Sequence, residues 1–271
     1  MNWELGITTG CCTTRPILDA LEGAAEAGIR TVEIGTPPRH FDPFAPGEVE
    51  SVRAALERLG MRAVSMHAPF GGAWELSEPD GAHSDAAVVS LLGAAEALRR
   101  LGGGIMVVHP SDVPRHRADP AERLVESARS LTRLCEGCRG LGIRVAVETP
   151  LPHLIGGDPA EFERLLGAVD GEIGVCLDTG HVHLGHHLGR FLEVAGDRLA
   201  HVHVHDNRGT GDDHLAPGEG SVNWEAVFSG LAGARYQGRL MLELHCPEGP
   251  LAEHFIGAHR RLRELMSHCR S

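Results

Sequence analysis

The chain has 271 residues, a hydrophobic fraction of 42% and a formal net charge of −12 at pH 7. This length suits one α/β barrel, and the hydrophobic fraction is sufficient for a large core. Acidic and basic residues are mixed along the chain without a basic block, which argues against a surface that coats nucleic acid. An acidic average does not, however, exclude a local basic patch.

Short β-rich segments alternate with helical patterns from one end of the chain to the other. The predicted strands span residues 4–10, 31–35, 62–70, 104–110, 144–150, 173–181, 200–207 and 239–245. The predicted helices span residues 16–28, 48–60, 84–101, 120–141, 158–169, 189–196, 223–236 and 250–267. Start and end signals support these helices: Asp158 and Pro159 open one of them, and Gly60 ends another.

This alternation predicts parallel strands joined by right-handed crossovers. We therefore expect an α/β fold that consists of a single (β/α)8 TIM barrel, formed as one domain over residues 1–271. The alternative is a doubly wound open sheet, but its dinucleotide fingerprint is missing. The glycine-rich stretch at residues 101–105 follows a helix and precedes a strand, which is the reverse of the order that the fingerprint needs.

The seven cysteines show no disulfide-framework spacing, and no apolar run approaches the length of a membrane span. The chain also opens without the charged and apolar pattern of a secretory signal. We therefore predict a cytoplasmic protein with reduced thiols and no membrane partner. Cys135 and Cys138 have a CxxC spacing, but they lie within a helical pattern and no second CxxC follows. We interpret them as helix residues rather than as half of a zinc site or a redox pair.

Metal-ligand residue types stand at or near the ends of the third to eighth predicted strands. These residues are His67, His109, Glu148, Asp178 with His181, His203 and Glu243. Active sites of such barrels lie at this end of the strands. Strand parity predicts that the side chains face the lumen, because His203 shares one face of its strand with His201 and His205, whereas valines take the other face. Asp212 and His214 follow on a loop that can fold over the same mouth.

Carboxylates that converge at one mouth repel each other, and uncompensated buried charge is costly. A divalent cation compensates this charge, and mixed carboxylate and imidazole ligands suit zinc, manganese or iron-like ions. We thus predict a divalent metal centre that holds one to three ions of Mn or Zn. Taken singly, the residues have simpler interpretations: His109 as a structural histidine, Asp178 as a helix N-cap and His201 as a hydrogen-bonding residue deeper in the strand. Glu33 and Trp74 are candidate pocket walls, with a structural role as the alternative for each.

Several short motifs follow one another along the chain. They are HAPF at residues 67–70, VVHP at 107–110, VET at 147–149, CLDTGH at 176–181, HVHDN at 203–207, DDHLAPGEGSVNW at 212–224 and LELH at 242–245. Together these motifs resemble those of the xylose isomerase-like barrel superfamily, over essentially the whole chain. That group holds sugar and sugar-phosphate isomerases and epimerases, and also abasic-site nucleases of the endonuclease IV type.

The resemblance to the epimerase branch, such as ketose 3-epimerases, implies one metal ion held by Glu148, Asp178, His203 and Glu243. The implied substrate is a small-molecule sugar or sugar phosphate. Glu148 and Glu243 would be the catalytic residues, one removing a proton and the other returning it, through a metal-stabilised enediolate. His181 and Arg208 are the implied substrate-binding residues.

The resemblance to the nuclease branch implies three zinc ions instead. The first ion would be held by His67, His109 and Glu148, the second by Glu148, Asp178, His203 and Glu243, and the third by His181, Asp212 and His214. All of these positions carry a suitable residue, and clustered metals suit phosphodiester cleavage.

Two features favour the isomerase and epimerase branch. The segment LAPGEGSVNW resembles the PGxGxxxW segment of that branch, and the loops after the strands are poor in the Lys and Arg that contact DNA phosphates. We therefore predict a metal-dependent sugar isomerase or epimerase, with a zinc-dependent abasic-site endonuclease as the alternative and nucleic acid as a partner only under that alternative. A non-catalytic metal or sugar sensor and a metal-dependent lyase-like enzyme remain open. A homo-oligomer is compatible with the resemblance, because barrels of this group often pair.

Overall fold

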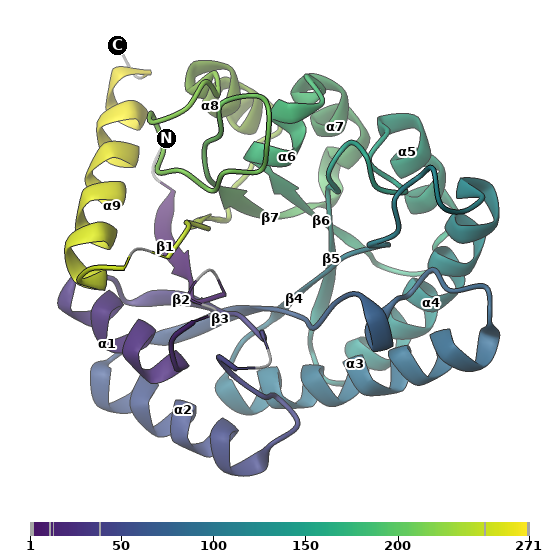
Figure 1. Ribbon diagram of the computed structural model, residues 1–271, viewed down its shortest axis with the longest axis horizontal. Helices are drawn as coiled ribbons and strands as arrows, with labels where there is room; N and C mark the ends of the chain where they lie inside the picture. Colours follow the sequence, from purple (N-terminus) through teal and green to yellow (C-terminus); the bar gives the residue numbers. More distant parts are fainter. Residues whose placement is uncertain (1–2, 11, 13, 38, 247, 270–271) are drawn as a thin grey trace.

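The computed structural model describes residues 3–269 except for positions 11, 13, 38 and 247, and it forms a closed barrel of eight parallel strands (Figure 1). The strands pair in sequence order, and β8 closes the barrel on β1. Their bounds are β1 Glu4–Thr8, β2 Thr31–Ile34, β3 Arg62–His67, β4 Ile105–Val108, β5 Arg144–Glu148, β6 Gly174–Asp178, β7 Leu199–Val204 and β8 Arg239–Leu242. The predicted (β/α)8 barrel is therefore confirmed.

Helices surround the strands as an outer ring (Figure 1). Their bounds are α1 Ile17–Glu26, α2 Pro46–Leu59, α3 Gly81–Leu101, α4 Pro120–Gly140, α5 Pro159–Ala168, α6 Thr179–Leu184, α7 Leu188–Ala195, α8 Trp224–Gly233 and α9 Leu251–His268. Two short 3₁₀ turns, Gly72–Trp74 and Gly196–Arg198, complete the set. The predicted sixth strand was too long at its C-terminal end, because Asp178 accepts a hydrogen bond from the backbone N–H of His181 and so caps helix α6.

Local signals in the sequence explain several helix limits. The side chain of Asp158 accepts hydrogen bonds from the first turn of α5, and α2 ends at Gly60 in the left-handed conformation, as predicted. Cys135 and Cys138 lie within α4 and are buried, which confirms their interpretation as helix residues. Burial raises the pKa of the Cys135 thiol to about 11, so this group is not poised for redox chemistry. Within the described part of the chain, none of the helices combines the length and apolarity needed to span a membrane.

Successive side chains along each strand point to opposite faces, and this alternation separates two apolar regions. Val145 and Val147 belong to the main core between the strands and the helices. Ala146, between them, belongs to a small separate cluster with Val107 and Cys176, which lies inside the barrel. The next inward positions after these three residues carry His109, Glu148 and Asp178. On β4, β5 and β6 the inward-facing side chains are therefore apolar beneath a layer of polar side chains at the C-terminal mouth.

The loop between β7 and α8 is ordered by the fully buried side chain of Asp206. Its carboxylate accepts hydrogen bonds from the backbone N–H groups of Gly218 (2.9 Å) and Val222 (3.0 Å) and from the indole N–H of Trp224 (3.0 Å). A side chain on Gly220 would come within 2.3 Å of the backbone of Asn207, so this position requires glycine. The PGxGxxxW segment thus builds a rigid loop over the mouth of the barrel.

Candidate active site and metal centre

The structure brings the predicted ligand residues together at the C-terminal mouth of the barrel. Together with His205, which was not among the predicted ligands, they form three sets in which the ligand atoms of each set lie within 4.8 Å of one another. We call them the first group (His67, His109 and Glu148), the central group (Glu148, Asp178, His203 and Glu243) and the outer group (His181, His205, Asp212 and His214). Glu148 belongs to both the first and the central group. Oδ1 of Asp178 in the central group lies 2.9 Å from Nε2 of His205 in the outer group, so the three sets form one continuous centre.

Glu148, at the end of β5, is the hub of this centre. Its Oε2 atom lies 3.1 Å from Nε2 of His67 and 2.9 Å from Nε2 of His109. Its Oε1 atom lies 2.9 Å from Nδ1 of His203. That same nitrogen lies 3.2 Å from Oε2 of Glu243, so two glutamates from β5 and the end of β8 approach a single imidazole nitrogen.

The carboxylates of the centre are held in the ionised state. Burial raises the pKa of Glu148, but the charge of His203 and hydrogen bonds from His109, His203 and His67 outweigh this effect and hold the pKa well below its usual range. The pKa of Glu243 is lowered in the same way, because the charge of His203 outweighs the effect of burial. Each carboxylate is therefore available to bind a cation or to accept a proton at neutral pH.

The imidazoles of the centre have correspondingly raised pKa values. Burial lowers the pKa of His109, but Asp112 and Glu148 outweigh it and raise the pKa to about 10. For His214, hydrogen bonding to Asp212 and the charge of Glu243 outweigh burial, and the pKa rises to about 10. Asp178 and Asp212 similarly raise the pKa of His181 to about 9. Without a metal ion, protons on these imidazoles balance the carboxylates.

In His67 and His109, the ring nitrogen that faces away from Glu148 forms a hydrogen bond. This bond indicates whether the other nitrogen can bind a metal ion. Nδ1 of His67 donates to the carbonyl of Ala68 (3.0 Å), and Nδ1 of His109 donates to Asp112 (2.7 Å). In a neutral ring, the lone pair of Nε2 then points at the Glu148 carboxylate. Such a contact between a lone pair and an anion is repulsive unless a proton or a cation lies between them. A ligand nitrogen whose partner nitrogen donates to a carbonyl or carboxylate is also the usual arrangement of metal-binding histidines. The donor set therefore fits a divalent ion.

Glu33 holds the central group from below, which corresponds to the structural role that was the alternative to a pocket wall. Its two carboxylate oxygens lie 2.8 Å from Nε2 of His201 and 2.8 Å from Nε2 of His203. All three side chains are fully buried, so Glu33 is not a pocket wall. Since Glu33 is the partner of Nε2 on His203, it directs Nδ1 of this ring to the central group. The expectation that His201 only forms hydrogen bonds is consistent with this contact.

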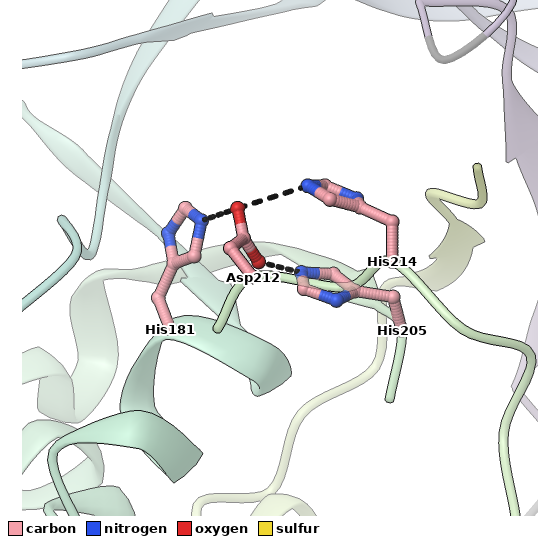
Figure 2. Close-up of side chains that lie close together, drawn as sticks. All are labelled: His181, His205, Asp212 and His214. Atoms are coloured by element: carbon pink, nitrogen blue, oxygen red, sulfur yellow. Dashed lines mark hydrogen bonds and ion pairs between the residues drawn. The ribbon is translucent and has the colours of Figure 1, made fainter. Parts of the chain in front are cut away.

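His205 belongs to the outer group, and the predicted ligand set did not include it (Figure 2). Its Nε2 atom lies 2.9 Å from Oδ1 of Asp178 and 3.7 Å from Oδ1 of Asp212. Its ring stacks on that of His214 with 4.0 Å between the centroids. The sequence feature that could have identified this residue is the alternation of histidines that begins in β7. This alternation places His205 on the same inward face as His203.

The two residues predicted to bind substrate lie in different surroundings. Nε2 of His181 lies 3.4 Å from Oδ2 of Asp212, within the outer group, so its position favours the predicted ligand role over a substrate contact. The side chain of Arg208 is 64% exposed, and its Nη1 atom lies 3.7 Å from Oδ2 of Asp213. Arg208 therefore borders the mouth without joining the metal centre, and its substrate role stays a prediction.

Aromatic side chains border the first group. Phe70, which is 51% exposed, stacks on the ring of His109 with 4.2 Å between the centroids. It forms an apolar wall that was not predicted from the sequence. The candidate wall Trp74 instead stacks against Phe44, and its indole N–H donates to Ser90 on α3.

The fold agrees with what comparison with known proteins finds. A model of the xylose isomerase-like TIM barrel family matches residues 21–270. The chain therefore belongs to the xylose isomerase-like TIM barrel family.

Relatives of both branches occur among similar proteins. The chain is 25% identical over 233 residues to a D-psicose 3-epimerase of Ruminiclostridium cellulolyticum, covering 82% of this chain and 76% of the relative. It is 27% identical over 237 residues to a probable endonuclease 4 of Nitratidesulfovibrio vulgaris, covering 78% of this chain and 81% of the relative. Its fold is similar to that of a D-tagatose 3-epimerase-like protein, with a TM-score of 0.86, 22% identity and 98% of each chain covered.

Proposed function

We propose that this protein is a divalent-metal-dependent isomerase or epimerase of sugars or sugar phosphates. The observation that carries the proposal is the placement of Glu148 and Glu243 on the same nitrogen of His203, at 2.9 and 3.2 Å. Two ionised carboxylates that converge on one ligand position can act on opposite sides of a bound substrate carbon. The similarity to epimerases and isomerases supports the same reaction class.

The central group would hold the ion. A bound divalent cation would polarise the carbonyl and the neighbouring hydroxyl of the sugar and offset the negative charge of an enediolate. Glu148 and Glu243 would exchange the proton of the carbon next to the carbonyl: one carboxylate removes it, and the other returns one. Glu243 is 14% exposed while Glu148 is almost fully buried, so the two carboxylates differ in their access to solvent.

The surroundings of the central group would suit a small polar substrate with an apolar edge. Phe70 supplies an aromatic face beside His109, and such faces pack against the C–H groups of a sugar ring or chain. Arg208 borders the mouth from the β7–α8 loop and is the proposed contact for a substrate oxygen or phosphate. The substrate would thus lie between the apolar wall and this loop.

A zinc-dependent abasic-site endonuclease is the second candidate, because every ligand position of the nuclease branch lies in one of the three groups. Charge at the mouth weighs against it. Arg115 pairs with Glu161 at 3.1 Å, and Arg123 pairs with Glu78 at 3.0 Å, so these guanidinium groups are already neutralised. A DNA-binding face needs several arginines or lysines directed at phosphates.

A paired assay tests both candidates. The protein, loaded with manganese or zinc, is incubated with ketoses and ketose phosphates in deuterated water, and separately with a duplex that contains one abasic site. We expect deuterium to enter a carbon-bound position of a sugar, and we expect the Glu243→Gln variant to lose this exchange while it keeps the wild-type circular dichroism spectrum. Glu4→Gln, at the opposite end of the barrel, is the control.

Two outcomes would overturn the proposal. Strand scission without deuterium incorporation would assign the site to the nuclease branch. Wild-type exchange in Glu243→Gln would show that this carboxylate does not move the proton.

A further inference from the structure

We propose that His205 is a positioning residue, which holds the carboxylate of Asp178 in the orientation that the central group needs to bind its ion. The inference deepens the proposed function and rests on it only in requiring a divalent ion at the central group. It concerns a residue that the predicted ligand set did not include, and one that acts through Asp178 without contact with the ion.

The ring of His205 is fully buried and directs one nitrogen at both oxygens of a single carboxylate. Its Nε2 atom lies 2.9 Å from Oδ1 of Asp178 and 3.1 Å from Oδ2. Within the described part of the chain, its Nδ1 atom has no hydrogen-bond partner. An N–H that is buried without an acceptor is costly, so the ring hydrogen belongs on Nε2, which donates it to Asp178. A nitrogen that donates in this way has no lone pair for a metal ion.

The hydrogen bonds of the Asp178 carboxylate leave one of its oxygens for the central group. Oδ1 accepts from the backbone N–H of His181 at 2.7 Å and from Nε2 of His205 at 2.9 Å. Oδ2 lies farther from His205, and it is 4.0 Å from Nδ1 of His203 in the central group. Because Oδ1 already has two close donors, Oδ2 is the oxygen that keeps a lone pair for an ion. His205 therefore fixes the rotation of this carboxylate and decides which oxygen it presents.

The surroundings of His205 hold its ring in place. The hydroxyl oxygen of Thr179 accepts a hydrogen bond from the backbone N–H of His205 (3.1 Å), and the hydroxyl donates to the carbonyl of the same residue (2.9 Å). The side-chain amide of Asn207 donates to the carbonyl of Gly180 (3.0 Å). The ring itself stacks on that of His214 (Figure 2). The segment after β7 and the first turn of α6 are thus joined by several bonds, which fix the ring relative to the Asp178 carboxylate.

Gly180 makes room for the ring of His205. A Cβ atom at this position would overlap Cε1 of the ring, so any side chain there would displace the imidazole from Asp178. The motifs CLDTGH and HVHDN therefore depend on each other: the glycine of the first motif admits the second histidine of the second motif. The carboxylate, the glycine and the imidazole form one unit whose effect falls on the central group.

Metal affinity of variants tests this role without an activity assay. Mn²⁺ is titrated into metal-free wild type, His205→Gln, His205→Leu and Gly180→Ala, and the free ion is followed by electron paramagnetic resonance. The class of Mn²⁺ that Glu243→Gln weakens identifies the central group, because Glu243 belongs to this group alone. We expect His205→Leu and Gly180→Ala to lower the affinity of this class by about 10 to 100-fold. His205→Gln should keep most of the affinity, because its amide can still donate an N–H to Asp178.

His40→Leu is the matched control for the loss of a buried imidazole. His40 is 3% exposed, and its Nδ1 atom lies 2.7 Å from the carbonyl oxygen of Arg15, outside the three groups. We expect this variant to unfold at a lower urea concentration but to bind Mn²⁺ with the affinity of wild type. An equal loss of affinity in His40→Leu and His205→Leu would overturn the proposal, because general destabilisation would then account for both.

Crystals of wild type grown with Mn²⁺ give a second test, which holds even if the variants fail to fold. We expect the ion of the central group to contact Oδ2 of Asp178, while Nε2 of His205 stays within hydrogen-bond distance of the same carboxylate. An ion bound directly to Nε2 of His205, or bound to Asp178 through Oδ1, would overturn the inference alone. So would wild-type affinity in a folded His205→Leu. A central group without an ion would overturn the proposed function as well.

Discussion

The two ends of the barrel both contain carboxylates, but they neutralise them in different ways. At the N-terminal end, Glu4 accepts hydrogen bonds from Thr31 on β2, from Arg62 on β3 (2.7 Å) and from Arg239 on β8 (2.8 Å). At the C-terminal mouth, the partners of the carboxylates are imidazoles. A guanidinium is always charged near neutral pH, whereas an imidazole carries charge only when it binds a proton.

From this difference we expect a cation to bind at the C-terminal mouth and not at the N-terminal end. The arginines around Glu4 supply permanent positive charge, so a metal ion would gain little there and would be repelled. The imidazoles of the mouth can exchange their protons for a metal ion, because a neutral ring offers a lone pair. Four changes test this contrast, beginning with the largest expected effect.

Replacement of Glu148 should have the largest effect. Glu148→Gln removes the charge that joins the first and central groups, and we expect the proton-transfer rate to fall by about 10² to 10⁴-fold. The measurement is steady-state turnover of whichever substrate the deuterium assay identifies. Glu4→Gln should keep wild-type turnover, because its ion pairs lie at the other end of the barrel. Equal losses in the two variants would contradict the contrast between the ends.

Replacement of Glu33 should act on metal affinity without contact with the ion. In Glu33→Gln the amide cannot accept hydrogen bonds from both His201 and His203, so the orientation of His203 is no longer held. We expect the affinity of the central group for Mn²⁺ or Zn²⁺ to fall by about 10 to 100-fold, as measured by competition with a chelator. Glu161→Gln is the matched control, since Glu161 is also buried but lies outside the three groups. Wild-type affinity in Glu33→Gln would rule out a positioning role.

Between pH 7 and pH 9 the stability of the metal-free protein should depend on pH mainly through the imidazoles of the mouth. The folded-state pKa values of His109 and His214 are raised to about 10 from an ordinary 6.5. Their stabilising contribution is complete below about pH 6.5 and is lost as the pH rises towards 10. The pKa of Glu4 is lowered instead, so its contribution is constant above its ordinary value of 4.5.

Urea denaturation in the presence of a chelator measures this dependence. We expect the free energy of unfolding to fall by at least about 1 kcal/mol between pH 7 and pH 10, because each unit of displaced pKa corresponds to about 1.4 kcal/mol. The zinc-loaded protein should lose less stability over this range, since the ion replaces the protons. A flat profile for the metal-free protein would show that the imidazoles of the mouth are neutral.

Truncation of Glu4 should have the smallest effect. Its side chain is 40% exposed, and exposed ion pairs contribute up to about 1 kcal/mol. We expect Glu4→Ala to lower the free energy of unfolding by no more than this, with unchanged zinc content by elemental analysis. Loss of zinc in Glu4→Ala would show that the two ends of the barrel are coupled.

The order of strands and helices could be predicted from the sequence, because it depends on local residue patterns. Alternating β-rich and helical segments impose parallel strands, and the chemistry of the strand ends then falls at one mouth. The limits of the elements were less accurate. The segment 173–181 was predicted as one strand, yet its last residues form the start of α6, because the side chain of Asp178 caps a helix there. The same carboxylate also belongs to the central group, so both of its predicted roles are compatible with the structure.

By itself, the sequence determined the barrel and predicted the inward faces of β5, β7 and β8 and the ligand positions, because strand parity and position along the chain decide these features. Only the tertiary structure decided that Glu33 lies beneath His203 and that His205 joins Asp212. Glu33 and His201 are 168 positions apart in the chain, and no local pattern relates them. The physical reason is that an imidazole's role depends on the partner of each ring nitrogen, and that partner is selected by how the closed barrel packs.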